Sequence, residues 1–180
     1  MRDLVVTENI TLDGVIDTSE GWFNPGDADL SDVLGALEVQ REAADAFLVG
    51  RQTFEDMRGY WPHQTDDPTG IADYLNAVAK YVVSTTLQDP QWEHSTVLRG
   101  LDEVEALKAT SGKDIVATGS ISLVHSLAAA GLVDEYRLFV YPVVIGKGER
   151  LFPDATTPAT LQLVESQPFR SGVTLLRYRT

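Results

Sequence analysis

The chain of 180 residues contains no cysteine, which excludes disulfide bonds and thiolate metal sites and is typical of a cytoplasmic protein, the location that we expect. Its three histidines are scattered, and no H-E-x-x-H pattern places two of them on one helix face, so a metal site is not expected. There is also no G-x-S-x-G sequence, the pattern around many serine nucleophiles. Metal-assisted and serine-based hydrolysis are therefore poor explanations of this chain.

Positive charge is scarce, because 14 lysines and arginines stand against 27 acidic residues, which gives a formal net charge of −13. Nucleic acids and anionic membrane surfaces would be repelled, so neither is an expected partner. No run of about 18 apolar residues predicts a membrane span. Any ligand that carries phosphate must be held by local donors, namely helix N-termini and a few well-placed cations.

Internal repeats and low-complexity tracts are also absent. Valine-rich apolar runs alternate with segments of helical period, the pattern of βαβ units around a mostly parallel sheet. We therefore predict one α/β domain over residues 1–180, a three-layer sandwich with a central mixed, mostly parallel sheet and a carboxyl-terminal β-hairpin. Strands are expected at residues 4–11, 47–49, 80–84, 96–98, 114–117, 135–144, 160–166 and 173–178. Helices are expected from residue 29 or 31, at 51–57, 71–79 and 102–108, and from residue 120.

Small polar residues follow three of the predicted strands. Gly119 and Ser120 come after strand 114–117 and open an apolar helix, the Gly50–Thr53 segment follows strand 47–49, and Ser84-Thr85 ends another strand. The N-terminus of a helix offers unpaired N–H groups to an anion, and ligands bind at the carboxyl ends of parallel strands. The same residues are also consistent with plain helix caps.

Arg51 supports the anion site, because a cation at the positive end of a helix is favourable when a phosphate lies between them. The alternative is a solvated arginine. Gly146-Lys147-Gly148 is a turn, since it lacks the third glycine and the following helix of a dinucleotide fingerprint. No pattern selects a general acid among the candidate carboxylates Asp13, Asp17, Asp29 and Asp32.

Four motifs in order resemble the dihydrofolate reductase-like superfamily: T-L-D-G-V-I at 11–16, V-G-R-Q-T-F-E at 49–55, Ser84-Thr85 and I-V-A-T-G-S at 115–120. With the tail from Gly131 to Pro153, the chain is similar to stand-alone bacterial proteins that look like the reductase domain of the bifunctional riboflavin-biosynthesis deaminase-reductase. The resemblance implies an oxidoreductase that binds NADPH and transfers a hydride to a pterin-, flavin- or pyrimidine-like heterocycle.

The resemblance also implies site residues. Positions 50–53 and 84–85 would hold the 2′-phosphate, positions 118–122 the diphosphate, and the first strand with its loop the nicotinamide and substrate ring. The coenzyme set is Val15, Ile16, Gly50, Arg51, Gln52, Thr53, Ser84, Thr85, Thr118, Gly119, Ser120, Ile121 and Ser122. On the substrate side it implies Asn9, and we add Trp22 and Phe23, two aromatic residues in a turn-rich loop, as a cover; alternatively they pack the loop down.

Two departures from that family limit the inference. Only Gly119 remains of a turn that often holds three glycines, and Leu34 and Leu37 occupy core-facing helix positions where dihydrofolate reductases carry a carboxylate. Dihydrofolate is therefore a poor candidate substrate. The alternatives are a non-catalytic nucleotide-binding or interaction protein that retains the reductase fold, and an enzyme with flavin as co-substrate. A homodimer is expected from the resemblance and from the long apolar strand Tyr136 to Val144, which we place near the sheet edge.

Overall fold

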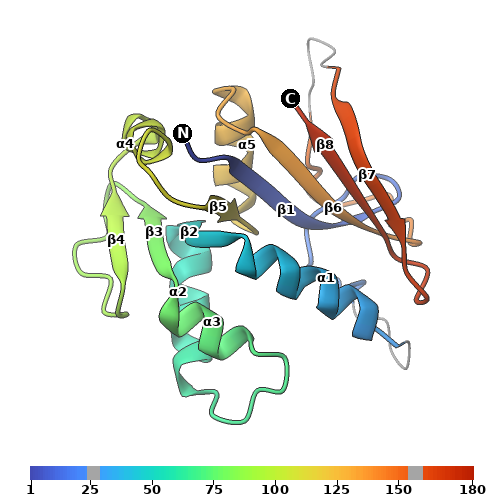
Figure 1. The fold of residues 1–180 in the computed structure, drawn as a ribbon, viewed down its shortest axis with the longest axis horizontal. Coiled ribbons are helices and arrows are strands. Elements are labelled where there is room, and N and C mark those ends of the chain that lie inside the picture. Colours follow the sequence, from blue (N-terminus) through green and yellow to red (C-terminus); the bar gives the residue numbers. More distant parts are fainter. Residues whose placement is uncertain (24–28, 154–159) are drawn as a thin grey trace.

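The computed structural model describes residues 1–23, 29–153 and 160–180, and its centre is an eight-stranded sheet (Figure 1). The strand order is β4-β3-β2-β5-β1-β6-β8-β7. Six neighbouring strands, from β4 to β6, pair in parallel, whereas β8 is antiparallel to both β6 and β7. The strands are β1 (Leu4–Thr11), β2 (Ala44–Gly50), β3 (Ala79–Val83), β4 (Ser95–Leu98), β5 (Asp114–Ala117), β6 (Glu135–Tyr141), β7 (Gln162–Pro168) and β8 (Thr174–Arg179).

Helices cover both faces of this sheet, so the predicted three-layer α/β fold is confirmed. The helices are α1 (Ser31–Glu42), α2 (Arg51–Tyr60), α3 (Ile71–Ala77), α4 (Leu101–Lys108) and α5 (Ile121–Ala129), with a 3-10 helix at Trp61–His63. On one face α4 and α5 pack against apolar side chains of β1, β2, β5 and β6. On the other, α1 covers β6 and β8, while α2 and α3 cover β2 and β3. Among the described residues, no helix is long and apolar enough to cross a membrane.

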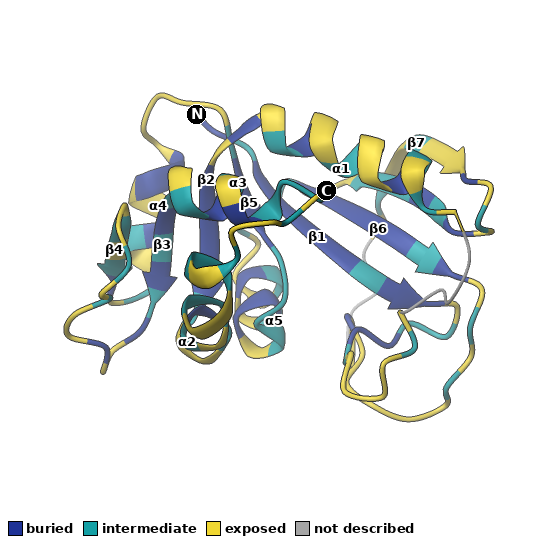
Figure 2. Cartoon of the chain, turned by 90° about the horizontal axis from the view of Figure 1, so that it is seen from below, coloured by how far each residue is buried: buried dark blue, intermediate teal, exposed yellow. Residues whose placement is uncertain are grey.

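Burial follows the order of the strands. The side chains of β1, β2, β5 and β6 are almost all buried, whereas those of β7 are mostly exposed (Figure 2). Parallel strands in the middle of a sheet are buried on both faces, and this produces the near-continuous apolar runs by which they were predicted. β7 ends the sheet, and Leu163 and Val164 lie half exposed on it.

Three sequence-based expectations were wrong in detail. β6 ends at Tyr141 rather than at residue 144, because Pro142 has no N–H for the ladder. It also lies inside the sheet between β1 and β8, so it is not the edge strand on which the dimer was argued. In α1, Leu34 is 37% exposed while Val33 and Gln40 are buried, so Leu34 does not face the core.

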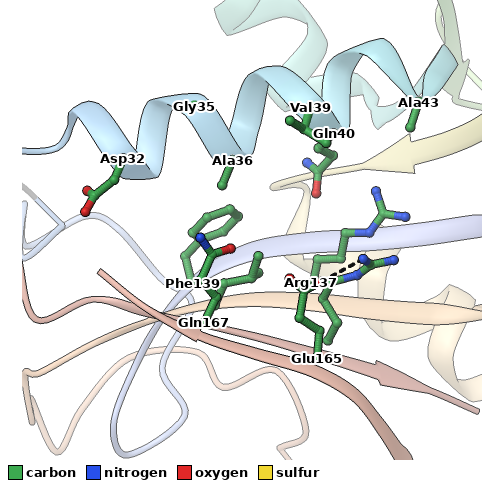
Figure 3. A pocket seen from close by; sticks show the side chains of 12 residues that line it. Asp32, Gly35, Ala36, Val39, Gln40, Ala43, Arg137, Phe139, Glu165 and Gln167 are labelled. Carbon is green, nitrogen blue, oxygen red and sulfur yellow. Dashed lines mark hydrogen bonds and ion pairs between the residues drawn. The ribbon is translucent and has the colours of Figure 1, made fainter. Parts of the chain in front are cut away.

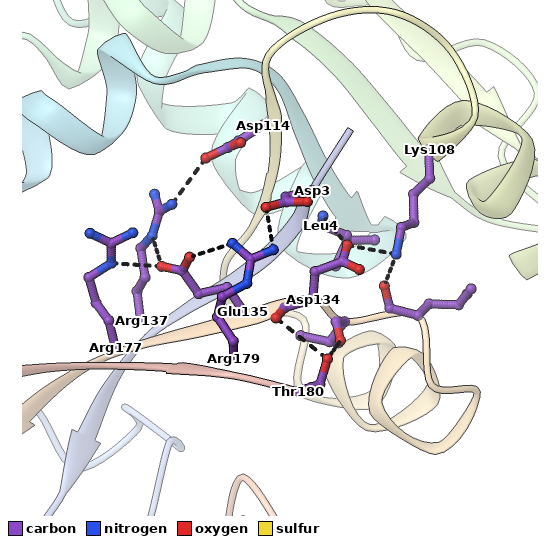
Figure 4. A network of polar contacts seen from close by, with 12 residues as sticks. Asp3, Leu4, Lys108, Asp114, Asp134, Glu135, Arg137, Arg177, Arg179 and Thr180 are labelled. Atoms are coloured by element: carbon purple, nitrogen blue, oxygen red, sulfur yellow. Dashed lines mark hydrogen bonds and ion pairs between the residues drawn. The ribbon is translucent and has the colours of Figure 1, made fainter. Parts of the chain in front are cut away.

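A network of charges joins the amino end of β6 to the neighbouring strands (Figure 4). Glu135, 2% exposed, accepts hydrogen bonds at Oε1 from Arg137 Nε at 2.6 Å and Arg177 Nε at 2.7 Å. Arg137 also bonds Asp114 of β5, and Arg177 bonds Glu165 of β7. Burial alone would raise the pKa of Glu135, but the hydrogen bonds from the two arginines outweigh it and hold the pKa below its usual value.

Replacing this buried carboxylate should be costly. In Glu135→Gln two guanidinium groups would face each other with no anion between them, and we expect the free energy of unfolding at pH 7 to fall by about 3–5 kcal/mol. Because the pKa is lowered in the folded state, the carboxylate contributes above pH 4.5 and its contribution is lost below it. The difference between the two proteins in urea denaturation should therefore shrink in acid. The exposed Glu165→Gln should lose less than about 1 kcal/mol, and an equal loss in both variants would contradict the prediction.

Candidate functional site

Two of the predicted turns meet at the carboxyl end of the sheet. β2 and β5 are neighbours, so the turn that leads from β2 into α2 lies beside the turn that leads from β5 into α5. The N–H of Gly50, the last residue of β2, donates to Ser120 Oγ at 2.8 Å. The structure thus brings together two segments that are 70 residues apart in the sequence.

The turn before α5 has an unusual backbone. Gly119 and Ser120 both have left-handed conformations, with φ of 59° and 57°. Such a conformation costs a serine roughly 1 kcal/mol or more, so the bond between Ser120 and Gly50 has to hold it. The carbonyl of Ser120 accepts the N–H groups of Leu123 and Val124, which starts the helix.

The first N–H groups of α5 remain open. Among the described residues, no acceptor faces the N–H groups of Ile121 and Ser122. A turn whose successive N–H groups point outward at a helix N-terminus is a ready binding site for an anion. The segment 118–122, for which the sequence predicts an anion site, thus has two open N–H groups, those of Ile121 and Ser122.

Arg51 lies at the start of α2, exposed to solvent, with its guanidinium beside the loop that follows β3. Nη1 donates to Thr86 Oγ1 at 2.6 Å, and Nε bonds Glu55 Oε1 at 3.0 Å one turn along the helix. An exposed pair of this spacing is worth only about 0.3–0.5 kcal/mol, so a phosphate could displace Glu55 at little cost. The neighbouring Gln52 bonds Asp56 and points to solvent, while Thr53 lies beside Gly119.

Ser84 does not present its hydroxyl as the resemblance implies. It is buried, and its Oγ accepts the N–H groups of Thr86 and Leu87 at 3.2 and 3.0 Å, which closes the loop on itself. Thr85 is exposed. Sequence reasoning missed Thr86, the hydroxyl that contacts Arg51, and also Arg99, whose Nη1 donates to the carbonyls of Ser84 and Leu87.

Val15 and Ile16 follow the first strand and are buried, at 1% and 3% exposed. Asp13 fixes this turn, because its carboxylate accepts the Thr11 hydroxyl at 2.7 Å and the Gly146 N–H at 2.8 Å. These hydrogen bonds lower the pKa of Asp13 to about 2. The side chain is therefore a brace that stays ionised, and it cannot hold a proton at neutral pH.

The three residues predicted on the substrate side lie toward the other face of the sheet. In the parallel register Asn9 pairs with Phe139, whose ring packs under α1. Trp22 packs edge-on against Tyr141 at 5.5 Å, and its Nε1 donates to the Asp17 carbonyl. Phe23 is partly exposed against Trp22. Trp22 therefore holds the loop down; the rest of the predicted loop, 24–28, lies outside the described residues.

Glu8 is the residue that the sequence-based search missed. It lies on β1, only 6% exposed, and its Oε1 accepts the N–H of Gly119 at 2.9 Å. Burial raises the pKa of Glu8 to about 8, although the hydrogen bond from Gly119 lowers it. The pKa values of the four carboxylates considered from the sequence, Asp13, Asp17, Asp29 and Asp32, are all lowered instead.

A separate cavity of about 380 Å³ lies between α1 and the strands β6, β8 and β7 (Figure 3). On the helix side the cavity is lined by the small residues Gly35 and Ala36, and the side-chain amide of Gln40 points into it. Arg137 and Arg177 line it from the sheet, but both are already paired with carboxylates. Arg137 is at the amino half of β6, so this cavity is distinct from the turns at the carboxyl edge.

Comparison with known proteins identifies the family of this chain. The family described as the RibD C-terminal domain matches residues 2–175. The chain belongs to that family. Protein YyaP of Bacillus subtilis (strain 168), whose function is uncharacterized, is 32% identical over 98% of this chain and 94% of its own length. Membership of the RibD C-terminal domain family supports a reductase-like role for this chain. Reductases of this family typically use a nicotinamide coenzyme.

Solved structures support the RibD-like fold. A pyrimidine reductase-like protein of Corynebacterium diphtheriae has a TM-score of 0.68 at 18% identity, over 98% of this chain and 91% of its own. The diaminohydroxyphosphoribosylaminopyrimidine deaminase/5-amino-6-(5-phosphoribosylamino)uracil reductase of Thermotoga maritima has a TM-score of 0.67 at 16% identity. That match covers 99% of this chain but 56% of the Thermotoga chain, and at these identities the likeness concerns the fold alone.

The contact between the two turns can be tested through Gly50. A Cβ added there would lie 3.2 Å from both Cβ and Oγ of Ser120, so Gly50→Ala should push the turns apart and lower the free energy of unfolding by about 1–3 kcal/mol. The φ of Gly50 is −80°, so the backbone itself admits alanine. The matched control is Gly59→Ala in α2, where nothing lies within 4 Å, and its stability should be unchanged or raised by up to about 1 kcal/mol. Equal urea midpoints for the two variants would refute the close approach.

Proposed function

We propose that this protein is an NADPH-dependent reductase that transfers a hydride to a pterin-, flavin- or pyrimidine-like heterocycle. The hydrogen bond from Gly50 to Ser120 carries the proposal, because it gathers the N-termini of α2 and α5 at one sheet edge together with Arg51. Two helix N-termini and a guanidinium are the local donors that an acidic protein needs to bind a doubly phosphorylated coenzyme.

Each part of the coenzyme has candidate partners in this chain. The open N–H groups of Ile121 and Ser122 suit the diphosphate, and Arg51 with Thr86 suits the 2′-phosphate. The bound coenzyme would supply the hydride. The protein's task is to hold the ring of the substrate against it and to exclude water. Asn9 of β1 and the partly exposed ring of Phe23 are the candidates, whereas Trp22 is engaged in packing its loop onto Tyr141.

A non-catalytic protein that binds a nucleotide or a partner is the alternative. It is favoured because two N–H groups of these turns are already bonded within the protein and are not free for a ligand. The Gly50 N–H bonds Ser120, and the Gly119 N–H bonds Glu8. The two functions differ in turnover. Consumption of NADPH on addition of a flavin, pterin or pyrimidine supports the reductase; binding of NADPH without consumption in any of these mixtures supports the alternative.

Arg51 allows a direct test of coenzyme choice. The 2′-phosphate is present in NADPH and absent from NADH, so Arg51→Ala should weaken NADPH binding about 10- to 100-fold and leave NADH nearly unchanged, as expected for loss of one charge-assisted contact. Isothermal titration calorimetry with each coenzyme measures both values.

The matched control for Arg51 is Arg170→Ala, an exposed arginine whose partners are Asp29 and Asp32 near the start of α1. It removes the same charge from the protein, but Arg170 contacts the start of α1 instead of α2 or the loop after β3, so the change should alter neither affinity. If the wild-type protein binds both coenzymes equally, and Arg51→Ala leaves them equal, the proposed 2′-phosphate site is wrong.

We also propose that the protein is a homodimer that pairs through β7. This strand ends the sheet, and the backbone groups on its free edge are available to pair with a strand of another copy. Two copies of β7 related by a two-fold axis would pair antiparallel and bring the half-exposed Leu163 and Val164 of each protomer beside the strand of its partner.

A charge on this edge should separate the protomers. Leu163→Lys places an ammonium group on β7, and sedimentation velocity should show a monomer where the wild type shows a dimer. Tyr60→Lys at the end of α2, which is equally exposed but distant from β7, should remain dimeric. A dimer that survives in Leu163→Lys, or a monomeric wild type, would exclude this interface.

A further inference from the structure

Glu8 occupies a position where a carboxyl group is unexpected. Side chains alternate along β1, so Glu8 shares a face with Leu4, Val6 and Ile10, which pack against the apolar side chains of α5. It is 6% exposed, and no cation among the described residues forms an ion pair with it. Its Oε1 is bonded to the Gly119 N–H, while Oε2 has no protein partner in the described part of the chain.

Glu8 lies next to the turn that we propose as the diphosphate site. Gly119 is the first of the two left-handed residues that turn β5 into α5, so Glu8 lies directly beneath the turn that presents the N–H groups of Ile121 and Ser122. An ionised Glu8 would place a negative charge one hydrogen bond away from the predicted diphosphate. A protonated Glu8 would hold the same N–H without that charge.

Other ionisable groups on the surrounding elements are engaged elsewhere. His125 of α5 lies 2.7 Å from the Arg150 carbonyl, Asp13 braces the turn after β1, and Asp114 and Arg137 pair with each other at the amino ends of β5 and β6. The remaining ionisable groups on β5, β6, α5 and the described loops that follow β1 and β6 or precede β6 are Asp17, Glu20, Asp134, Glu135, Tyr136, Tyr141, Lys147, Glu149 and Arg150. Burial is the main cause of the raised pKa of Glu8, and the hydrogen bond from the Gly119 N–H opposes it.

We propose that Glu8 is a positioning residue that sets the affinity of the 118–122 turn for the diphosphate of a dinucleotide coenzyme through its own protonation. This inference rests on the proposed coenzyme site and adds its control. The neutral carboxyl fixes Gly119 and accommodates the anion; when the proton leaves to solvent, the carboxylate repels the diphosphate in a poorly solvated site.

The sign of the pH dependence follows from linkage. The anion favours protonated Glu8, so binding and proton uptake support each other. Burial already raises the pKa of Glu8 to about 8 in the free protein, so affinity should be constant below that pH and fall above it, by at most about tenfold per pH unit for one linked proton. NADPH and NADH share the diphosphate, so both should weaken by the same factor, unlike the selective effect of Arg51→Ala.

The test measures the affinity of wild type and of Glu8→Gln for each coenzyme by calorimetry, from about pH 6.5 to about pH 9.5. This range lies on both sides of the pKa of Glu8, which is about 8. Glutamine keeps an oxygen for the Gly119 N–H but cannot ionise. The affinity of Glu8→Gln for both coenzymes should therefore lack the decrease at high pH that we expect for wild type. Glu38→Gln on the exposed side of α1 is the matched control and should behave as wild type. The inference is overturned if wild type and Glu8→Gln have the same pH profile.

A second measurement on the coenzyme-free protein separates this inference from the proposed function. The amide ¹⁵N shift of Gly119 should titrate with a midpoint near pH 8 in wild type and stay constant in Glu8→Gln. A Gly119 shift that does not titrate overturns the role of Glu8 even if coenzymes bind. A shift that titrates while neither coenzyme binds at any pH overturns the proposed function, and with it the diphosphate as ligand of this turn.

Discussion

The candidate site depends on one short contact between two turns. Gly50 ends β2 and Ser120 precedes α5, and the hydrogen bond between them is favoured because Gly50 has no Cβ, which would lie only 3.2 Å from the Ser120 side chain. The bond supports Ser120 in a left-handed conformation, and that conformation turns the first N–H groups of α5 outward. The geometry of the edge thus follows from the absence of one methyl group and the presence of one hydroxyl.

The sequence was sufficient for most of the sheet. β1 and β5 were predicted with their observed bounds, because each contains three consecutive buried apolar residues and is followed within three residues by a glycine. The end of β6 was missed because Val143 and Val144 continue the apolar run, although Pro142 interrupts the ladder. The place of β6 inside the sheet could not be read at all, since strand order depends on pairing between distant segments.

The candidate site was predicted in outline and missed in its contacts. Gly50, Arg51, Gly119 and Ser120 do converge, as expected for turns at the ends of neighbouring parallel strands. The hydroxyl of Ser84, however, accepts hydrogen bonds from the loop that follows it. The conformation of that loop decides these bonds, and the local sequence does not specify it. Glu8 had a signal, namely a carboxyl group in phase with Leu4, Val6 and Ile10, but its partner Gly119 is 111 residues away.

The position of Trp22 has a practical consequence. The chain has three tryptophans, and Trp61 and Trp92 both belong to the cluster beneath α2 and α3, whereas Trp22 rests on Tyr141 near α1. A protein with phenylalanine at positions 61 and 92 would carry a single tryptophan, Trp22. The emission maximum and the quenching of its fluorescence would report changes in the surroundings of residue 22. With those two substitutions, the fluorescence of Trp22 would report on the side of the sheet where the proposed substrate would bind.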